Sequence, residues 1–277
     1  MYLTRLAVFD LDRTLLDDSS SISDELERRL AAAMVPGLSC TVASGRDFEH
    51  IAPFVHQLGW GSIPVIAEQG AVIIDPTSGL VLMEQLVSPT VLTATMDALR
   101  STPLPLNVIL YGRDVPLWFK HAGDRGHLGA RDTSWYNEQA LDIPDVSELA
   151  VANVRKISVK CRPEHIDAIQ STLSRSLGSH ANVVKADVNF INIMDARVSK
   201  GTALQWLIDS LGISAADVMA VGDCEADRSM LMVAGVPVAV SNADEQTRSL
   251  ARYVVPSNNE LGVAVALEGF ADGRFKR

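Results

Sequence analysis

Short apolar runs alternate along the chain with longer segments whose apolar residues recur every three or four positions. The short runs predict strands at residues 6–9, 38–43, 65–67 and 71–74. The longer period predicts a helix over about 23–34, with Leu26, Leu30 and Ala33 on one face. A second helix is expected to carry Phe48 and Ile51. Strands that alternate with helices at this spacing indicate a parallel sheet wound on both faces.

The rhythm changes near residue 83 and returns after residue 188. Between these points the pattern predicts longer, alternating strands at 106–111, 155–161 and 181–185, with helices at 89–99 and 163–177. Afterwards it predicts helices at 200–211 and 225–233 and strands at 218–221 and 236–240. We therefore expect an α/β fold: a doubly wound, parallel-sheet, Rossmann-like core at 1–82 and 189–277, with an inserted α+β cap at 83–188.

Bulk properties narrow the class of protein. The formal net charge of −10 over 277 residues argues against a general nucleic-acid or membrane-surface binder. No apolar run approaches the length needed to cross a bilayer. Three cysteines, Cys40, Cys161 and Cys224, follow no disulfide framework and favour a reducing compartment. We expect a cytoplasmic protein that is a monomer or a homodimer, with no nucleic-acid or membrane partner.

Four loops of the predicted core carry polar residues next to an apolar strand or at the start of a helix. They supply, in chain order, Asp10 with Asp12, then Ser44, then Lys200, and finally Asp223 with Asp227. In an open parallel sheet such loops meet outside the carboxyl ends of the strands. Paired carboxylates are tolerable where a cation neutralises them, and oxygen ligands suit Mg²⁺. A hydroxyl beside the backbone N–H groups of a helix start, and an ammonium, suit a phosphate. Together these residues indicate metal-assisted phosphoryl transfer.

These motifs, Asp-x-Asp-x-Thr, Ser-Gly-Arg, Lys-Gly and Gly-Asp-x-x-x-Asp, resemble those of the haloacid dehalogenase superfamily of phosphatases. The position and length of the insertion are similar to the type IIB cap of the Cof-like and sucrose-phosphatase-like sugar phosphatases. The resemblance covers the whole core, whereas the cap matches in length and rhythm alone.

The resemblance implies a reaction in two steps. Asp10 would be the nucleophile that forms an aspartyl-phosphate, and Asp12 the acid and then the base. Mg²⁺ would be the cofactor and a small phosphorylated metabolite, a sugar phosphate first, the substrate. Mg²⁺ would be held by Asp10, the backbone carbonyl of Asp12 and Asp223, with Asp227 in a supporting position or acting through water. The phosphate-binding set would be Ser44, Gly45, Arg46, Lys200 and, as a pocket-wall candidate, Asn242. Thr14 would order the first loop.

The chain departs from the family pattern at three positions. Arg13 stands where Gly is common, and we expect its side chain to point away from the metal. Cys224 and Ala226 stand where Asn is common, which puts the usual phosphate contact in doubt. The acidic surroundings of Cys224 should disfavour a thiolate.

Two other functions stay open at this stage. A phosphotransferase or phosphomutase would use the same Asp10 on another acceptor, and a non-catalytic protein would bind a phosphometabolite without cleaving it. Retention of both Asp10 and Asp12 argues against the second, because a binder does not need the acid–base carboxylate. In the cap, the cluster at Tyr111, Arg113 and residues 118–120 could equally form the substrate face or the cap core.

Overall fold

A computed structural model describes residues 3–104, 106–112, 117–121, 141–142 and 153–276, without side chains at 117–121 and 141–142. The chain divides into two compact units, Met1–Met83 with Ser199–Arg277, and Glu84–Val198. The first boundary lies one residue after the expected position. The second lies ten residues beyond the expected end of the cap at 188, because β11 (Phe190–Asp195) pairs with strands of the inserted unit.

The first unit is built on a five-stranded sheet in the order β14-β13-β12-β1-β2, and every neighbouring pair is parallel. Its strands are β1 (Arg5–Phe9), β2 (Leu38–Val42), β12 (Val218–Gly222), β13 (Val236–Val240) and β14 (Tyr253–Val255). Strand β1 lies inside the sheet, between β12 and β2, and is buried except for Arg5 at its start. The predicted doubly wound α/β core is confirmed.

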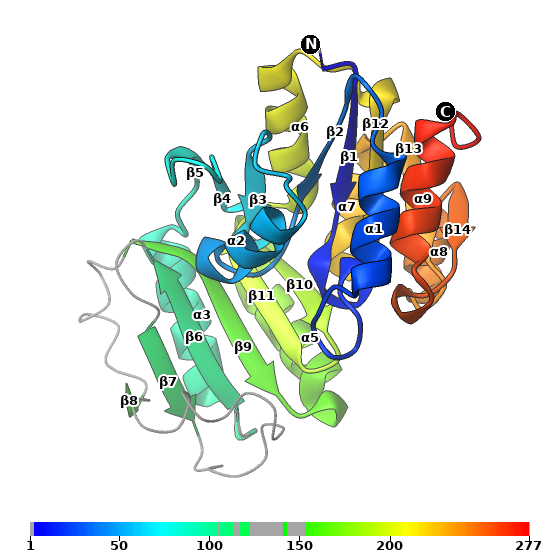
Figure 1. Cartoon of the computed structure of the whole chain (residues 1–277). Coiled ribbons are helices and arrows are strands. Elements are labelled where there is room, and N and C mark those ends of the chain that lie inside the picture. Colours follow the sequence, from blue (N-terminus) through cyan, green and yellow to red (C-terminus); the bar gives the residue numbers. More distant parts are fainter. Residues whose placement is uncertain (1–2, 105, 113–116, 122–140, 143–152, 277) are drawn as a thin grey trace. The chain divides into compact units, whose positions relative to one another are not determined.

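Helices cover both faces of this sheet (Figure 1). The helices of the unit are α1 (Asp24–Ala33), α2 (Phe48–Gln57), α6 (Lys200–Leu211), α7 (Arg228–Val233), α8 (Glu245–Leu250) and α9 (Gly262–Ala271). Leu26 and Leu30 of α1 share one apolar core with Leu267 of α9. Leu204 of α6 and Met230 of α7 belong to the core on the other face.

The strands predicted at 65–67 and 71–74 do not continue the parallel sheet in the expected way. They form β3 (Val65–Ala67) and β4 (Val72–Ile74), which pair antiparallel and join β5 (Val81–Glu84) in a separate three-stranded sheet. A single parallel bridge from Ala43 to Ile66 links β3 to the end of β2. The four residues at 68–71 that connect the two strands are too few for a helical crossover, so the strands have to form a hairpin.

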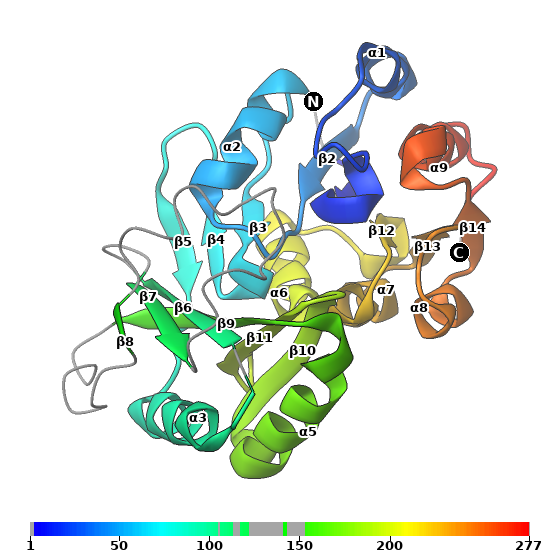
Figure 2. The same cartoon turned by 90° about the horizontal axis from the view of Figure 1, so that it is seen from below.

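The inserted unit is a six-stranded sheet in the order β10-β11-β9-β6-β7-β8, with two long helices on one face (Figure 2). Its elements are β6 (Leu106–Gly112), β7 (Leu117–His121), β8 (Leu141–Asp142), β9 (Val154–Cys161), β10 (Ala181–Asp187), β11, α3 (Pro89–Ser101) and α5 (Ile166–Leu177). Leu99 of α3 and Leu173 of α5 pack in one core with Ile157 and Val159 of β9. The expected α+β character of the insertion is confirmed.

The structure describes only part of the cluster that the sequence indicated in the cap. In the proposed cap cluster, Tyr111 lies under the ammonium of Lys156, 3.8 Å from Nζ to the ring centroid. Arg113 lies outside the described residues, as do the side chains at 118–120.

Among the helices that the structure describes, none combines the length and apolarity of a transmembrane span.

Candidate active site

Asp10 follows directly on the interior strand β1. Its backbone N–H donates to the carbonyl of Val221 at 3.0 Å, which extends the pairing of β1 with β12 by one residue. The chain then makes a single wide turn, Leu11–Leu15, in which the N–H of Leu15 donates to the carbonyl of Asp10 at 3.2 Å. Asp10 is 5% exposed, so its carboxylate sits in a largely dry environment.

Lys200 opens helix α6, whose first turn is capped by the side chain of Ser199. Its Nζ donates to Oδ1 of Asp10 at 2.5 Å and to Oδ1 of Asp227 at 2.7 Å, and all three side chains are buried. The next residue, Gly201, allows α6 to approach α7, because a Cβ there would lie 2.4 Å from the carbonyl oxygen of Ser229. Gly201 thus lets α6 come close to α7, and the buried ammonium of Lys200 lies against Asp10, the candidate nucleophile.

The loop after β12 brings Asp223 and Asp227 to the same place. Oδ2 of Asp227 accepts from the backbone N–H of Asp223 at 2.9 Å and from that of Cys224 at 3.1 Å. Since its Oδ1 bonds Lys200, the Asp227 carboxylate holds the loop and the lysine together. Asp223 is 4% exposed.

Burial dominates the electrostatics of this cluster. Desolvation, with Asp227 as a neighbour, raises the pKa of Asp10 to about 7, against the lowering effect of Lys200. Desolvation and the neighbours Asp227 and Asp10 raise the pKa of Asp223 to about 8. Burial alone would lower the pKa of Lys200, but Asp10 and Asp227 raise it above its ordinary value. Three buried carboxylates around one ammonium leave a local excess of negative charge.

This donor set fits a divalent cation with oxygen ligands. Asp10 and Asp223 supply buried carboxylates whose ionised forms are costly until a cation neutralises them. Asp223, Cys224 and Asp227 can bring ligand atoms within 4.8 Å of one another. The contacts of Asp227 with Lys200 and with two backbone N–H groups agree with the supporting position expected for it.

Asp12 and Arg46 form a pair that the sequence did not predict. Arg46 Nε donates to Asp12 Oδ2 at 3.0 Å and Nη2 to Oδ1 at 2.5 Å. The Asp12 side chain is 49% exposed, whereas Asp10 is buried. The Arg46 guanidinium also lies over the ring of Phe54, 5.6 Å from its centroid. Arg46, expected in the phosphate-binding set, is thus engaged with the predicted acid.

Ser44 is buried at the end of β2, and its surroundings differ from the expected helix start. Helix α2 begins at Phe48 behind an Asp47 cap, three residues after Gly45. The N–H of Ser44 donates to Ile66, and the N–H of Arg46 donates to Ser44 Oγ at 3.1 Å. The start of α2 is thus separated from Ser44 and capped by Asp47, and the role of the Ser44 hydroxyl in binding phosphate stays a prediction.

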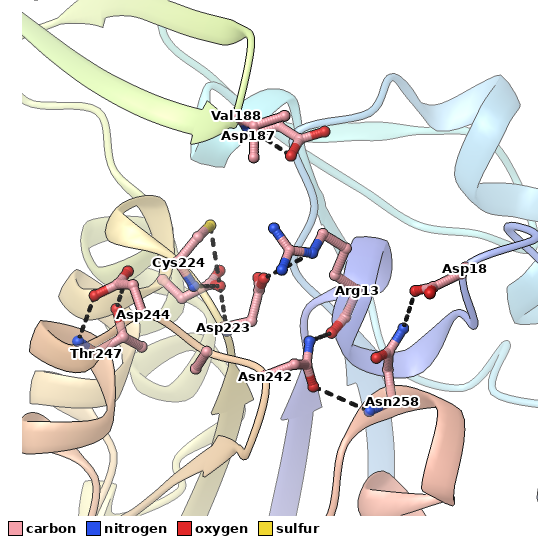
Figure 3. Close-up of polar contacts among 12 residues, drawn as sticks. Arg13, Asp18, Asp187, Val188, Asp223, Cys224, Asn242, Asp244, Thr247 and Asn258 are labelled. Atoms are coloured by element: carbon pink, nitrogen blue, oxygen red, sulfur yellow. Dashed lines mark hydrogen bonds and ion pairs between the residues drawn. The ribbon is translucent and has the colours of Figure 1, made fainter. Parts of the chain in front are cut away.

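Asn242 fixes the first loop through side-chain hydrogen bonds. Its Nδ2 donates to the carbonyl of Arg13 at 2.8 Å, and its Oδ1 accepts from the N–H of Asn258 at 3.1 Å (Figure 3). Asn258 in turn donates to the carbonyl of Leu16 at 3.0 Å. These contacts hold the first loop, and the position of Asn242 in the pocket wall stays a prediction. Asn258 was missed by the sequence analysis, because no motif marks it.

Arg13 contradicts the expectation that its side chain points away from the metal ligands. Its Nε lies 3.8 Å from Oδ2 of Asp223. Its backbone has φ 60°, a left-handed conformation in which Gly is favoured. Thr14 is buried, but its hydroxyl has no hydrogen-bond partner among the described residues. The side-chain amides of Asn242 and Asn258, and not Thr14, therefore fix this loop.

The connection Glu68–Gly70 is a second feature that the sequence did not reveal. Glu68 and Gln69 are buried and have φ 51° and 62°, and their N–H groups donate to the carbonyls of Arg46 and Ser44. At Gly70, a Cβ would lie 2.3 Å from the carbonyl oxygen of Ser199. This strained turn therefore braces the Ser44 loop against the start of α6. The positive φ of Glu68 and Gln69 leaves no signal in residue type.

Of the two other departures from the family pattern, the thiol of Cys224 donates to Oδ2 of Asp227 at 3.5 Å, within the same loop. Burial and the surrounding carboxylates raise the pKa of the Cys224 thiol well above its ordinary value, in agreement with the expected disfavoured thiolate. Ala226 is 6% exposed and adds apolar surface beneath the loop.

Comparison with known proteins agrees with this arrangement. The profile of the haloacid dehalogenase-like hydrolases matches residues 7–267. A 5-amino-6-(5-phospho-D-ribitylamino)uracil phosphatase of Bacillus subtilis is 26% identical over 284 residues, which cover 96% of this chain and 98% of the relative. The phosphoglycolate phosphatase of Archaeoglobus fulgidus is 48% identical over 151 residues, or 54% of this chain and 66% of the relative.

Among solved structures, a sugar phosphatase of haloacid dehalogenase subclass IIB superposes with a TM-score of 0.79. The superposition covers 96% of this chain and 99% of the other at 18% sequence identity. At this identity the likeness concerns the fold, including the inserted cap.

Proposed function

Since the chain belongs to the haloacid dehalogenase-like hydrolase family and is a phosphatase, we propose that it hydrolyses monoesters of small phosphorylated metabolites, sugar phosphates first, through a phosphorylated Asp10. The observation that carries the proposal is the buried cluster in which Lys200 bonds Asp10 and Asp227, with Asp223 beside it. The substrates of the two phosphatases named above, 5-amino-6-(5-phospho-D-ribitylamino)uracil and phosphoglycolate, support the substrate class.

In the first step an oxygen of Asp10 attacks phosphorus, and the bond from phosphorus to the leaving oxygen breaks. Lys200 holds Asp10 in place and keeps positive charge next to the incoming phosphate. Asp12 delivers a proton to the leaving oxygen and afterwards takes one from the water that hydrolyses the aspartyl-phosphate. The Asp12 carboxylate in its pair with Arg46 has the form that accepts a proton in the second step, and it has to leave this pair to carry a proton in the first.

Asp10 and Asp223 would hold Mg²⁺ together with the backbone carbonyl of Asp12. When bound, the cation offsets the repulsion between the Asp10 carboxylate and the phosphate. Asp227 keeps the Asp223 loop in position through its two backbone hydrogen bonds. The hydroxyl of Ser44 would donate to a phosphate oxygen, with Gly45 beside it.

The test is phosphate release from a panel of sugar phosphates, phosphoglycolate and nucleotide monophosphates, with Mg²⁺ or with EDTA. We expect Mg²⁺-dependent release that falls by at least roughly a thousandfold in Asp10→Asn, because the amide cannot serve as the nucleophile. Circular dichroism serves as the folding control. Release that persists in a folded Asp10→Asn variant would refute the nucleophile assignment, and transfer of phosphate to sugar in preference to water would indicate a phosphotransferase.

We also propose a cytoplasmic location and a small metabolite as the only kind of partner needed for activity. The three cysteines are free thiols in the structure, with Cys40 and Cys161 buried. Cell fractionation with a tagged chain tests the location, and size-exclusion chromatography with light scattering decides between monomer and homodimer.

A further inference from the structure

The feature that the reaction leaves unexplained is Arg13, a bulky cation at the turn that follows the two catalytic carboxylates. Its φ of 60° is a left-handed conformation that is unfavourable for a non-glycine residue. Its carbonyl is nevertheless fixed by Asn242 Nδ2 at 2.8 Å, and Asn242 is itself fixed by Asn258. The backbone is therefore held in a conformation that gives the side chain a defined direction.

That direction leads to Asp223. Figure 3 shows the side chain of Arg13 directed at Asp223. Arg13 Nε lies 3.8 Å from Asp223 Oδ2, and the two side chains are 46% and 5% exposed. The cation thus reaches from the solvent side of the loop to a buried carboxylate. Lys200 bonds the other two buried carboxylates, Asp10 and Asp227. Positive charge is in this way distributed over the whole acidic cluster before any metal is considered.

A divalent cation on Asp223 meets this guanidinium at close range. Either the ion pair persists and two cations share one carboxylate, or the pair breaks and its energy is lost. Both alternatives lower the affinity of the site for the metal. Two charges about 4 Å apart at a protein surface interact strongly enough to change this affinity measurably. With Gly at position 13 neither effect would exist.

We propose that Arg13 is an internal counter-ion of Asp223 that competes with the divalent metal and sets its affinity. The inference rests on the proposed Mg²⁺ site. Arg13 is a positioning residue in this account: it stabilises the metal-free loop and weakens the metal-bound one.

The test is isothermal titration of MgCl₂ into metal-free protein, which measures affinity without any substrate. We expect Arg13→Gln, which removes the charge and keeps most of the length, to bind Mg²⁺ roughly tenfold more tightly than wild type. Arg13→Lys should remain within about threefold of wild type because it keeps the charge. The matched control is Arg28→Gln on α1, whose side chain is 70% exposed and pairs with Glu25. It should leave the affinity unchanged.

A second measurement uses thermal unfolding. In EDTA, Arg13→Gln should melt below wild type because Asp223 has lost its counter-ion, and saturating Mg²⁺ should remove that difference. If Arg13→Gln folds poorly, Arg13→Gly takes its place in the test. This variant relieves the backbone strain and should show the same tighter Mg²⁺ binding.

Equal Mg²⁺ affinity in wild type, Arg13→Gln and Arg13→Gly would overturn the counter-ion role while leaving the hydrolase intact. Absence of Mg²⁺ binding in wild type, with hydrolysis unaffected by EDTA, would overturn both this role and the proposed metal site.

Discussion

At the scale of single residues, Lys200 has a role both in the proposed reaction and in the stability of the fold. It is 2% exposed and bonds two carboxylates that are themselves buried. Removing one partner of a buried ionic group leaves an uncompensated charge, which is far more costly than losing a surface pair. The same ammonium that steadies the nucleophile therefore also makes this part of the core tolerable.

We expect Lys200→Met to lower the free energy of unfolding by about 3–5 kcal/mol at pH 7.5 in EDTA, and to abolish turnover. Urea denaturation followed by circular dichroism measures the first effect. The control is Lys276→Met, since Lys276 is exposed. A loss below about 1 kcal/mol, the range of exposed ion pairs, would mean that the buried cluster relaxes or takes up protons without strain.

Residue identity predicted part of this site and missed the rest for a physical reason. Asp10, Lys200, Asp223 and Asp227 come together because strand order and helix starts position them. The contacts of Arg46 with Asp12 depend on side-chain reach across two loops, which no residue pattern specifies. The direction of Arg13 depends on a left-handed backbone that is favoured by Gly and rarely adopted by Arg.

At the scale of elements, the approach of α6 to α7 determines where Lys200 sits. Gly201 lies against the backbone of Ser229, and its N–H donates to Ser229 Oγ at 3.0 Å. A side chain at this position would separate the two helices or turn α6 about its axis, and either movement shifts the ammonium from Asp10.

Gly201→Ala should therefore lower the free energy of unfolding by about 1–3 kcal/mol, the usual range for overpacking, and reduce turnover at least tenfold. Urea denaturation and phosphate release under saturating substrate provide the two readings. Gly61→Ala is the matched control, because its added Cβ would meet only Thr77 Oγ1 at an ordinary 3.6 Å. If both variants behave like wild type, the close helix contact is not what positions Lys200.

The elements show a similar division between what sequence predicts and what it does not. Helix α6 and strand β13 begin and end at the expected residues, since their apolar patterns are bounded by clear polar starts and turns. The antiparallel pairing of β3 with β4 could not be predicted, because a short apolar run looks the same in a hairpin and in a parallel crossover. The expected cap end at 188 precedes β11, because the pattern does not show that residues 190–195 pair with a strand of the insertion.

At the scale of the whole molecule, the buried carboxylates make stability depend on pH. The folded pKa values of Asp10 and Asp223, about 7 and about 8, lie above the ordinary value of 3.8. The native state consequently binds more protons than the unfolded chain between these limits. Stability contributed by the protonated forms is complete below pH 3.8 and is lost as pH rises through 7 to 8.

We expect the melting temperature in EDTA to fall as pH rises from 5.5 to 8.5, and to fall less in Asp223→Asn. Mg²⁺ should raise the melting temperature more at pH 8 than at pH 6, since the metal has to displace protons from its ligands. Scanning fluorimetry across this range is the measurement. Identical pH profiles for wild type and Asp223→Asn in EDTA would contradict the raised pKa of Asp223.

The pairing of β1 with β12 carries a consequence for how the chain reaches its native state. Residues 6–9 pair with residues 218–221, so the central pair of the sheet closes a loop of more than 200 residues. Contacts of such separation form late and slowly, because the entropy of closing the loop comes before any gain from pairing. The nucleophile leaves the first of these strands and Asp223 follows the second. Catalytic competence therefore cannot arise early during synthesis, and phosphate release becomes a direct report that the most distant parts of the core have come together.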